Sequence, residues 1–344
     1  MTTTERREPT LTEKICFLSR PDAYPLAPAS VSMIETHMSF VFLAGARVYK
    51  LKKPVRYPFL DFSTLSSREH NCREEVRLNR RLAPDVYLGV APLGFSPEGG
   101  FALFVSDPDS TVVDWLVEME RLPADDMLDR RIRQRRVADS QIDDLSELLT
   151  KFYCKAAPSP LCPQDYFARF IDEQAINRDI LGRCRFAFDR SQINRLLETL
   201  DMLLDDCRET LLARVECGAI VDGHGDLRPE HICLTHPIVI FDCLEFNVTL
   251  RQVDPFDELA YLGVECAALG ARQIGDRIMA AFKARTTRPP PQRLISFYAA
   301  WRALLRARLS VAHLLEPTPR QPAKWEPQAR IYLTIASRLL NETK

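Results

Sequence analysis

Two short stretches of the sequence are the most informative about the fold: His224-Gly225-Asp226-Leu227-Arg228-Pro229-Glu230-His231 and, further on, Val239-Ile240-Phe241-Asp242. The first stretch places one carboxylate, that of Asp226, in a glycine-containing turn. The second is an apolar run, typical of a short β-strand, that ends in another carboxylate, Asp242. A base and a metal ligand presented in this way suit a reaction that needs proton removal and charge neutralisation.

Two other interpretations of the first stretch need weighing. Asp226 could simply cap a helix after an ordinary turn. Gly223 and Gly225 could begin a G-x-G-x-x-G dinucleotide motif, but Arg228 stands where that motif needs its third glycine. The independent presence of Asp242 favours the catalytic interpretation.

The spacing of the first stretch is similar to the protein-kinase catalytic loop, H-R-D-L-x-x-x-N, with His231 in the place of the Asn. Together with Asp242, it resembles the aminoglycoside phosphotransferase family and, more widely, the protein-kinase-like superfamily. The segment Asp254–Ala260 resembles the D-P-x-x-D-L-A segment of that family. The resemblance spans roughly residues 31–312, and its best match is a bacterial branch of uncharacterised members.

The resemblance implies an α+β, two-lobed protein-kinase-like fold. We expect an N-terminal extension over 1–30 and then a nucleotide-binding N-lobe over 31–120. This N-lobe would consist of a small antiparallel sheet with one main helix. A larger, mainly helical C-lobe follows over 121–344, with the catalytic loop at 222–247. The hydrophobic pattern agrees: it predicts strands at 38–43, 47–53, 87–95, 101–105 and 112–119, and a helix over 66–82. Later helices are predicted over 139–155, 164–181, 189–214, 254–269, 271–285, 291–315 and 323–340.

The resemblance also implies roles for the loop residues. Phosphoryl transfer depends mainly on positioning and on charge neutralisation. We expect Asp226 to accept the proton of the attacking hydroxyl, Arg228 to lie over the transferred group and His224 to order the loop. Asp242 and His231 are the expected metal ligands. An imidazole is softer than an amide oxygen, so Mn²⁺ is an alternative to Mg²⁺.

The nucleotide site is expected around the strand at 47–53. Lys50 and Lys52 would project from one face of this strand and Lys53 from the other, and either of the first two could hold phosphate. Lysines on a solvated edge strand are the plain alternative. The helix at 66–82 offers Glu75 as the partner of the strand lysine, with Glu74 as the second choice; a solvated helix face is the alternative for both.

Four further features complete the expected site. The backbone near Glu120 and Leu122 would bind adenine. Thr36-His37-Met38-Ser39 stands where a glycine-rich loop could lie, and no G-x-x-x-x-G-K-[ST] P-loop occurs. Asp257 would brace the catalytic loop. Glu245, three residues after Asp242, could reach the metal or the acceptor.

Composition limits the class of protein. The chain has 344 residues, 46% of them hydrophobic and 27% charged, with a net charge of −1, which gives no drive toward nucleic acid or an anionic membrane. The ten cysteines form no C-x-x-C pair, so a zinc module is not indicated and reduced thiols in a cytoplasmic protein are expected. The N-terminal stretch lacks the apolar region of a signal peptide.

The sequence therefore predicts an ATP-dependent kinase that phosphorylates a hydroxyl of a small molecule, without nucleic acid, membrane or obligate protein partner. Two alternatives stay open: a protein kinase or other nucleotide transferase that acts on protein, and a non-catalytic nucleotide-binding pseudokinase. The absence of an A-P-E activation segment after Asp242 favours a small acceptor, and the two aspartates disfavour the pseudokinase.

Overall fold

The computed structural model describes residues 8–104, 110–183 and 185–342. The chain forms two compact units, Met1–Ala124 with Val239–Val248, and Asp125–Ile238 with Thr249–Lys344. The first contains an antiparallel sheet with one main helix and the second is mainly helical, which confirms the predicted α+β class. The start of the predicted extension 1–30, residue 105 of the predicted strand 101–105 and the last two residues of 121–344 lie outside the described residues.

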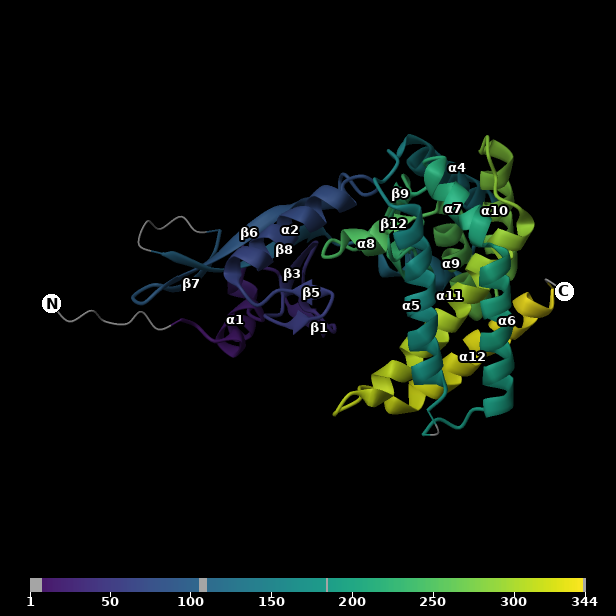
Figure 1. The fold of residues 1–344 in the computed structure, drawn as a ribbon. Coiled ribbons are helices and arrows are strands. Elements are labelled where there is room, and N and C mark those ends of the chain that lie inside the picture. Colours follow the sequence, from purple (N-terminus) through teal and green to yellow (C-terminus); the bar gives the residue numbers. More distant parts are fainter. Residues whose placement is uncertain (1–7, 105–109, 184, 343–344) are drawn as a thin grey trace. The chain divides into compact units, whose positions relative to one another are not determined.

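A six-stranded antiparallel sheet forms the first unit, in the order β1-β2-β3-β8-β6-β7 (Figure 1). The strand at 38–43 pairs with the one at 47–53 across Gly45, whose positive φ of 65° suits a tight turn. The elements of this unit are α1 (Leu11–Leu18), β1 (Val31–Glu35), β2 (Ser39–Ala44), β3 (Arg47–Lys52), β4 (Arg56–Tyr57), β5 (Leu60–Asp61), α2 (Leu65–Asn79), β6 (Tyr87–Ser96), β7 (Gly100–Leu103), β8 (Thr111–Glu120) and β11 (Val239–Ile240).

Helix α2 covers one face of this sheet and runs along β6 and β8 (Figure 1). Thr64 begins the helix by accepting a hydrogen bond from the Ser67 N–H, which satisfies a backbone group left open at a helix start. Cys72, Glu75 and Asn79 recur at helical spacing and are buried against the sheet. This spacing carries the fully buried Glu75 carboxylate to two side chains of β3, those of Lys50 and Lys52.

The second unit consists mainly of long helices. Its elements are α3 (Leu128–Arg133), α4 (Asp139–Lys155), α5 (Pro163–Leu181), α6 (Arg190–Asp206), α7 (Arg208–Glu216), β9 (Val221–Asp222), β10 (Ile232–Cys233), α8 (Val248–Arg251, which starts at the last residue of the first unit), β12 (Gln252–Val253), α9 (Pro255–Ala268), α10 (Arg272–Arg285), α11 (Gln292–Ala312) and α12 (Pro322–Asn341). Strands β9 and β12 pair antiparallel on either side of the predicted loop.

One predicted helix is wrong as a single element. The range 189–214 contains two helices, α6 and α7, which meet at Cys207. Apolar residues stay buried on both sides of this junction, for example Leu204 and Leu211. The helical spacing of apolar residues therefore continues through Cys207, so the sequence pattern could not show that the helix breaks there. The last predicted residues of 291–315 likewise form a short 3₁₀ turn, His313–Leu315, after α11 ends.

The core of the second unit surrounds α9, which is buried on nearly every side. Helix α11 packs against α12, α9 and α5 (Figure 1). Helices α9 and α10 approach closely at two glycines, since a Cβ on Gly275 would lie 2.4 Å from the Gly263 Cα. Within the described residues, each helix is either too short or too polar to cross a bilayer.

Candidate active site

In the first unit, one glutamate holds both predicted lysines. Lys50 Nζ lies 2.8 Å from Glu75 Oε1, and Lys52 Nζ lies 2.6 Å from Glu75 Oε2. Both lysines point to the same side of β3, as alternation along a strand requires. Glu74 lies on another face of α2, where its carboxylate pairs with Arg77 at 2.7 Å. The structure thus brings Glu75, rather than Glu74, to the strand lysines.

Two more carboxylates complete this charged cluster. Lys50 Nζ is also 2.8 Å from Asp242 Oδ1, and Lys52 Nζ forms an ion pair with Glu245 Oε1. Lys52 and Glu75 are fully buried, whereas the Asp242 side chain is 42% exposed. The sequence offered Glu245 only as a residue that could reach a metal or an acceptor; in the structure its carboxylate pairs with Lys52.

The pKa shifts follow from this arrangement. Burial disfavours the charged form of Lys50, but the surrounding carboxylates outweigh burial and hold its pKa well above the ordinary value. Burial likewise opposes the charge of Glu75, yet the two lysines lower the pKa of its carboxyl. For Glu245, burial is the larger effect and raises the pKa, although Lys52 opposes the rise.

The backbone that carries Asp242 is held in an unusual conformation. Asp242 has a φ of +60°, a left-handed geometry that aspartate tolerates better than most residues. Its N–H donates to the Tyr87 hydroxyl at 3.2 Å, and the next N–H, of Cys243, donates to Asn79 Oδ1 at 2.9 Å. Tyr87 is on β6 and Asn79 ends α2, so both the sheet and the helix fix the direction of the Asp242 side chain.

The remaining predicted nucleotide residues lie at the end of β8 and at the β1–β2 turn. Glu120 is the last residue of β8; its N–H donates to the Val86 carbonyl and its carboxylate pairs with Arg47. Leu122 follows the strand. Thr36 and Ser39 close the β1–β2 turn through backbone and hydroxyl hydrogen bonds, so this turn is a tight hairpin without glycine. Lys53 pairs with Glu35, apart from the other two lysines.

In the second unit, the loop after β9 gathers polar contacts around Asp226. Tyr261 of α9 donates its hydroxyl to Asp226 Oδ1 at 3.0 Å, and Arg228 Nη2 lies 2.9 Å from Asp226 Oδ2. The Asp226 N–H donates to His224 Nδ1 at 3.3 Å, which keeps the turn compact. Burial opposes the charge of Asp226, but positive neighbours, Arg228 foremost, outweigh it and lower the pKa of the carboxyl.

His231 and Arg228 also contact one another. His231 Nδ1 lies 2.9 Å from the Asp226 carbonyl oxygen, a contact in which the ring nitrogen must donate. Its other nitrogen, Nε2, lies 3.2 Å from Arg228 Nη2, a group that can only donate. Both ring nitrogens therefore have protein partners within the loop, so the ring holds Asp226 and Arg228 in place.

Helix α9 anchors the loop through residues that the sequence did not single out. Glu258 accepts hydrogen bonds from the His224 N–H at 2.9 Å, from the Gly225 N–H and from the Tyr153 hydroxyl at 2.7 Å. Burial raises the pKa of the Glu258 carboxyl, although these donors oppose the rise. The D-P-x-x-D-L-A resemblance pointed to its neighbour, Asp257.

Asp257 has a different partner. Its carboxylate forms a buried bidentate pair with Arg302 of α11, at 2.7 and 2.6 Å. Asp254, at the start of the same segment, caps α9 by accepting from the Phe256 N–H and pairs with Arg214. These residues hold α9 in place, and α9 in turn presents Glu258 and Tyr261 to the loop. A charged residue inside a buried helix was the sequence signal that could have revealed Glu258.

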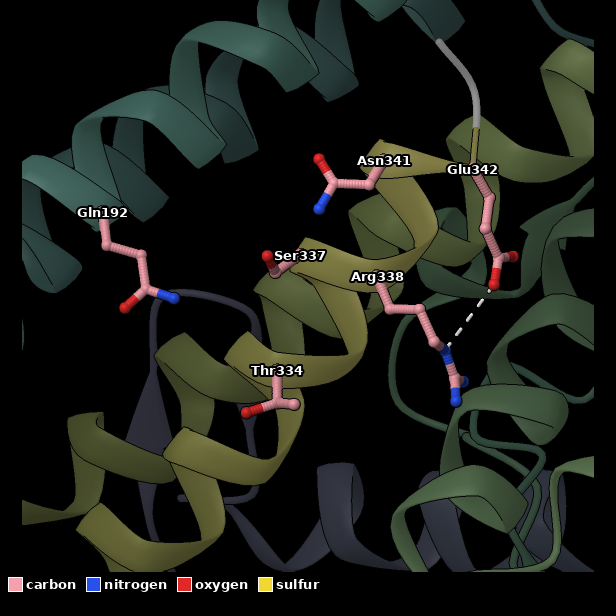
Figure 2. A pocket seen from close by; sticks show the side chains of 6 residues that line it. All are labelled: Gln192, Thr334, Ser337, Arg338, Asn341 and Glu342. Atoms are coloured by element: carbon pink, nitrogen blue, oxygen red, sulfur yellow. Dashed lines mark ion pairs between the residues drawn. The ribbon is translucent and has the colours of Figure 1, made fainter.

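A divalent cation suits the side chain of Asp242. A carboxylate is a hard oxygen ligand of the kind that Mg²⁺ prefers, and this one is accessible. Within the residues the structure describes, no group of three or more His, Cys, Asp or Glu side chains forms a ready metal site. The second unit also has a polar pocket lined by α6 and α12, but none of the predicted site residues lines it (Figure 2).

Comparison with known sequences finds relatives of undetermined function. The chain is 31% identical over 315 residues to uncharacterised proteins of Mycobacterium tuberculosis and Mycobacterium bovis, which covers 88% of this chain. The match covers 59% of each relative, so the chain spans about three-fifths of the length of these curated relatives. A scan of family models finds no match.

Comparison with solved structures identifies the fold. A choline/ethanolamine kinase family protein from Mesorhizobium loti matches with a TM-score of 0.56 and 14% identity, over 96% of this chain and 99% of that one. Choline kinase from Streptococcus pneumoniae matches with a TM-score of 0.53 and 13% identity, over 97% and 100%. Aminoglycoside 2′-phosphotransferase-IIIa, in its GDP complex, matches with a TM-score of 0.51 and 13% identity, over 93% and 95%. The chain therefore has the α+β fold of the aminoglycoside phosphotransferase and choline kinase structures, as the resemblance of its loop predicted.

Proposed function

We propose that the protein is an ATP-dependent phosphotransferase that transfers the γ-phosphoryl group to a hydroxyl of a small molecule. The observation that carries the proposal is the position of Lys50, held between buried Glu75 and accessible Asp242. A lysine fixed by a helix glutamate, beside a carboxylate that can hold a metal, is the arrangement that phosphoryl transfer requires. This cluster lies wholly within the first unit.

Lys50 is the better candidate of the two strand lysines for a phosphate ligand. Its side chain is 15% exposed, whereas that of Lys52 is fully buried between two carboxylates. Phosphate oxygens would replace Asp242 as the partner of Lys50 at little cost, because both are anionic acceptors. Lys52 could bind phosphate only by giving up its ion pairs with Glu75 and Glu245 in the interior, which is strongly unfavourable.

Asp226 is the proposed base. Its lowered pKa keeps it ionised at neutral pH, so it can accept a hydrogen bond from an acceptor hydroxyl and take its proton as the transfer proceeds. Arg228 pairs with Asp226, and this pairing keeps the largely buried guanidinium group charged. The guanidinium group could then also offset negative charge on the transferred group. His224 and His231 order this loop through their contacts with the Asp226 backbone.

Asp242 would hold Mg²⁺ or Mn²⁺, with His231 as the second candidate ligand from the sequence. A bound metal ion would neutralise part of the negative charge of the phosphates. The contacts of His231 favour the ordering role, since metal binding at Nε2 would require Arg228 to leave that nitrogen. Asp242 is the more accessible of the two, since its side chain is 42% exposed and that of His231 is 8% exposed.

A small acceptor is the class favoured by the similar structures, which are choline kinases and aminoglycoside phosphotransferases by name. The nucleotide is proposed as ATP, and GTP is the alternative to test, because one of these structures contains GDP. A protein acceptor and a pseudokinase are the other two outcomes of the test.

The test has two stages. First, thermal melting of the purified chain is measured with ATP or GTP and Mg²⁺ or Mn²⁺; a ligand at 100 times its dissociation constant stabilises a protein by about 2.7 kcal/mol. Second, nucleotide consumption is followed across a library of small hydroxyl compounds. We expect Asp226→Asn to keep the melting shift while turnover falls by about 10²–10⁴-fold, the usual contribution of a general base. No melting shift with any nucleotide would refute the proposal, and unchanged turnover in Asp226→Asn would refute the base.

A further inference from the structure

A second ion pair lies behind the lysine proposed to bind phosphate. Lys52 Nζ is 2.6 Å from Glu75 Oε2 and also pairs with Glu245 Oε1. The charges therefore alternate along a chain from Glu245 through Lys52, Glu75 and Lys50 to Asp242. The Glu245 end of this chain is buried and the Asp242 end is accessible: Lys52 and Glu75 are fully buried, Glu245 is 7% exposed, Lys50 15% and Asp242 42%.

The buried end of this chain must be nearly neutral to be stable. A buried ammonium group loses several kcal/mol of hydration and needs close counter-charges. Glu75 is divided between two ammonium groups, so one carboxylate serves two cations there. Glu245 supplies the second buried negative charge. Lys52, Lys50, Glu75 and Glu245 together are then neutral, and the charge of Asp242 remains in excess.

Phe246 fixes the same segment from the other side. Its ring lies 6.5 Å from the ring of Phe62, edge to face, and the Lys52 ammonium group lies 4.9 Å above the Phe62 ring. Lys52 is fully buried and Glu245 nearly so, with an aromatic ring beside the ammonium group, so an unbalanced charge there is felt strongly. Only two residues separate Asp242 from Glu245 in the sequence, so the ion pair also restrains the residue proposed to bind the metal.

We propose that Glu245 is a positioning residue: by neutralising Lys52, it leaves the charge of Asp242 available to a divalent cation. This inference rests on the proposed function, because it assigns metal binding to Asp242. Without the Glu245 charge, two lysines would share Glu75 and Asp242, and Lys50 would compete more strongly with the cation for Asp242. Glu245 itself does not touch the metal or the acceptor.

The test compares three variants by the Mg²⁺ concentration needed for half-maximal ADP binding, measured by titration calorimetry. Glu245→Gln changes the charge of the five-residue cluster from −1 to 0 and should raise that concentration about tenfold, which corresponds to about 1.4 kcal/mol. Lys52→Met with Glu245→Gln restores −1 and should return the Mg²⁺ dependence close to that of the wild type. Glu69→Gln, on the exposed face of α2 where Glu69 pairs with Arg73, is the matched control and should change nothing.

The outcomes separate the two proposals. A wild-type chain that binds no nucleotide at any Mg²⁺ concentration refutes the proposed function and this inference with it. A wild type that binds, together with a Glu245→Gln variant of unchanged Mg²⁺ dependence, overturns this inference alone. If Glu245→Gln does not fold, the double variant decides: wild-type Mg²⁺ dependence supports charge balance, and a tenfold loss overturns it. A merely structural role would lower the melting temperature without shifting the Mg²⁺ dependence.

Discussion

Replacing Tyr261 by Phe tests how the protein keeps its proposed base ionised. The Tyr261 hydroxyl donates to Asp226 Oδ1 at 3.0 Å, and burial holds the pKa of Tyr261 well above its ordinary value, so it remains a donor throughout the accessible pH range. The ring itself lies beside the guanidinium group of Arg302, at 5.0 Å, and would be retained in Phe. The substitution therefore removes one hydrogen bond and little packing.

The expected magnitude follows from the charge of the acceptor. A hydrogen bond to a charged group contributes about 1.5–3 kcal/mol, and one between neutral groups about 0.5–1.5 kcal/mol. The difference, about 1–1.5 kcal/mol, is the preference of the hydroxyl for ionised over protonated Asp226. Because one pKa unit equals 1.36 kcal/mol, Tyr261→Phe should raise the pKa of Asp226 by about one unit.

The sign of the effect on stability is determined by the lowered pKa of Asp226. A carboxyl whose pKa is lower in the folded state stabilises the fold above its unfolded pKa, and that stabilisation is lost as pH falls through the folded pKa. Tyr261→Phe should therefore lower the free energy of unfolding by about 1–1.5 kcal/mol more at pH 7 than at an acid pH below the folded-state pKa of Asp226.

Denaturant unfolding of wild type and variant at the two pH values measures this difference, and the pH profile of kcat/KM gives an independent reading. The acidic limb of that profile should move up by about one pH unit, while the rate at pH 7 changes less than tenfold, because Asp226 stays ionised there. Equal destabilisation at both pH values would show that Tyr261 acts through packing, and would refute the reasoning.

Two further predictions concern the loop. His231→Asn should lower turnover, because Asn cannot contact Arg228 and the Asp226 carbonyl together, yet leave the ratio of Mg²⁺ to Mn²⁺ activity as in the wild type; a shift of that ratio toward Mg²⁺ would instead make His231 a metal ligand. Gly223→Ala should destabilise the protein by about 1–3 kcal/mol in thermal unfolding, since the new Cβ would lie 2.4 Å from Glu258 Oε2, whereas Gly89→Ala meets nothing within 4 Å and should cost less. Equal losses in the two glycine variants would contradict the crowding at Gly223.

Much of the fold could be predicted from local pattern. The strands and the main helix of the first unit follow from alternation and from helical periodicity, because burial of one face imposes those periods on the sequence. The residue spacing of the loop at 222–247 pointed to the same fold, through its resemblance to the kinase loop. The break between the two helices at Cys207 could not be predicted, because apolar residues are buried on both sides of it and the hydrophobic pattern continues.

Five charged candidates for the site could be identified from the sequence without the structure: Lys50, Lys52, Glu75, Asp226 and Asp242. It left open which lysine is accessible and which residue braces the loop, because burial and pairing depend on residues distant in sequence. Only the tertiary structure placed Glu245 on Lys52 and Glu258 under the loop. The energy of a charge is set by what surrounds it in space, and neighbours along the chain do not specify that environment.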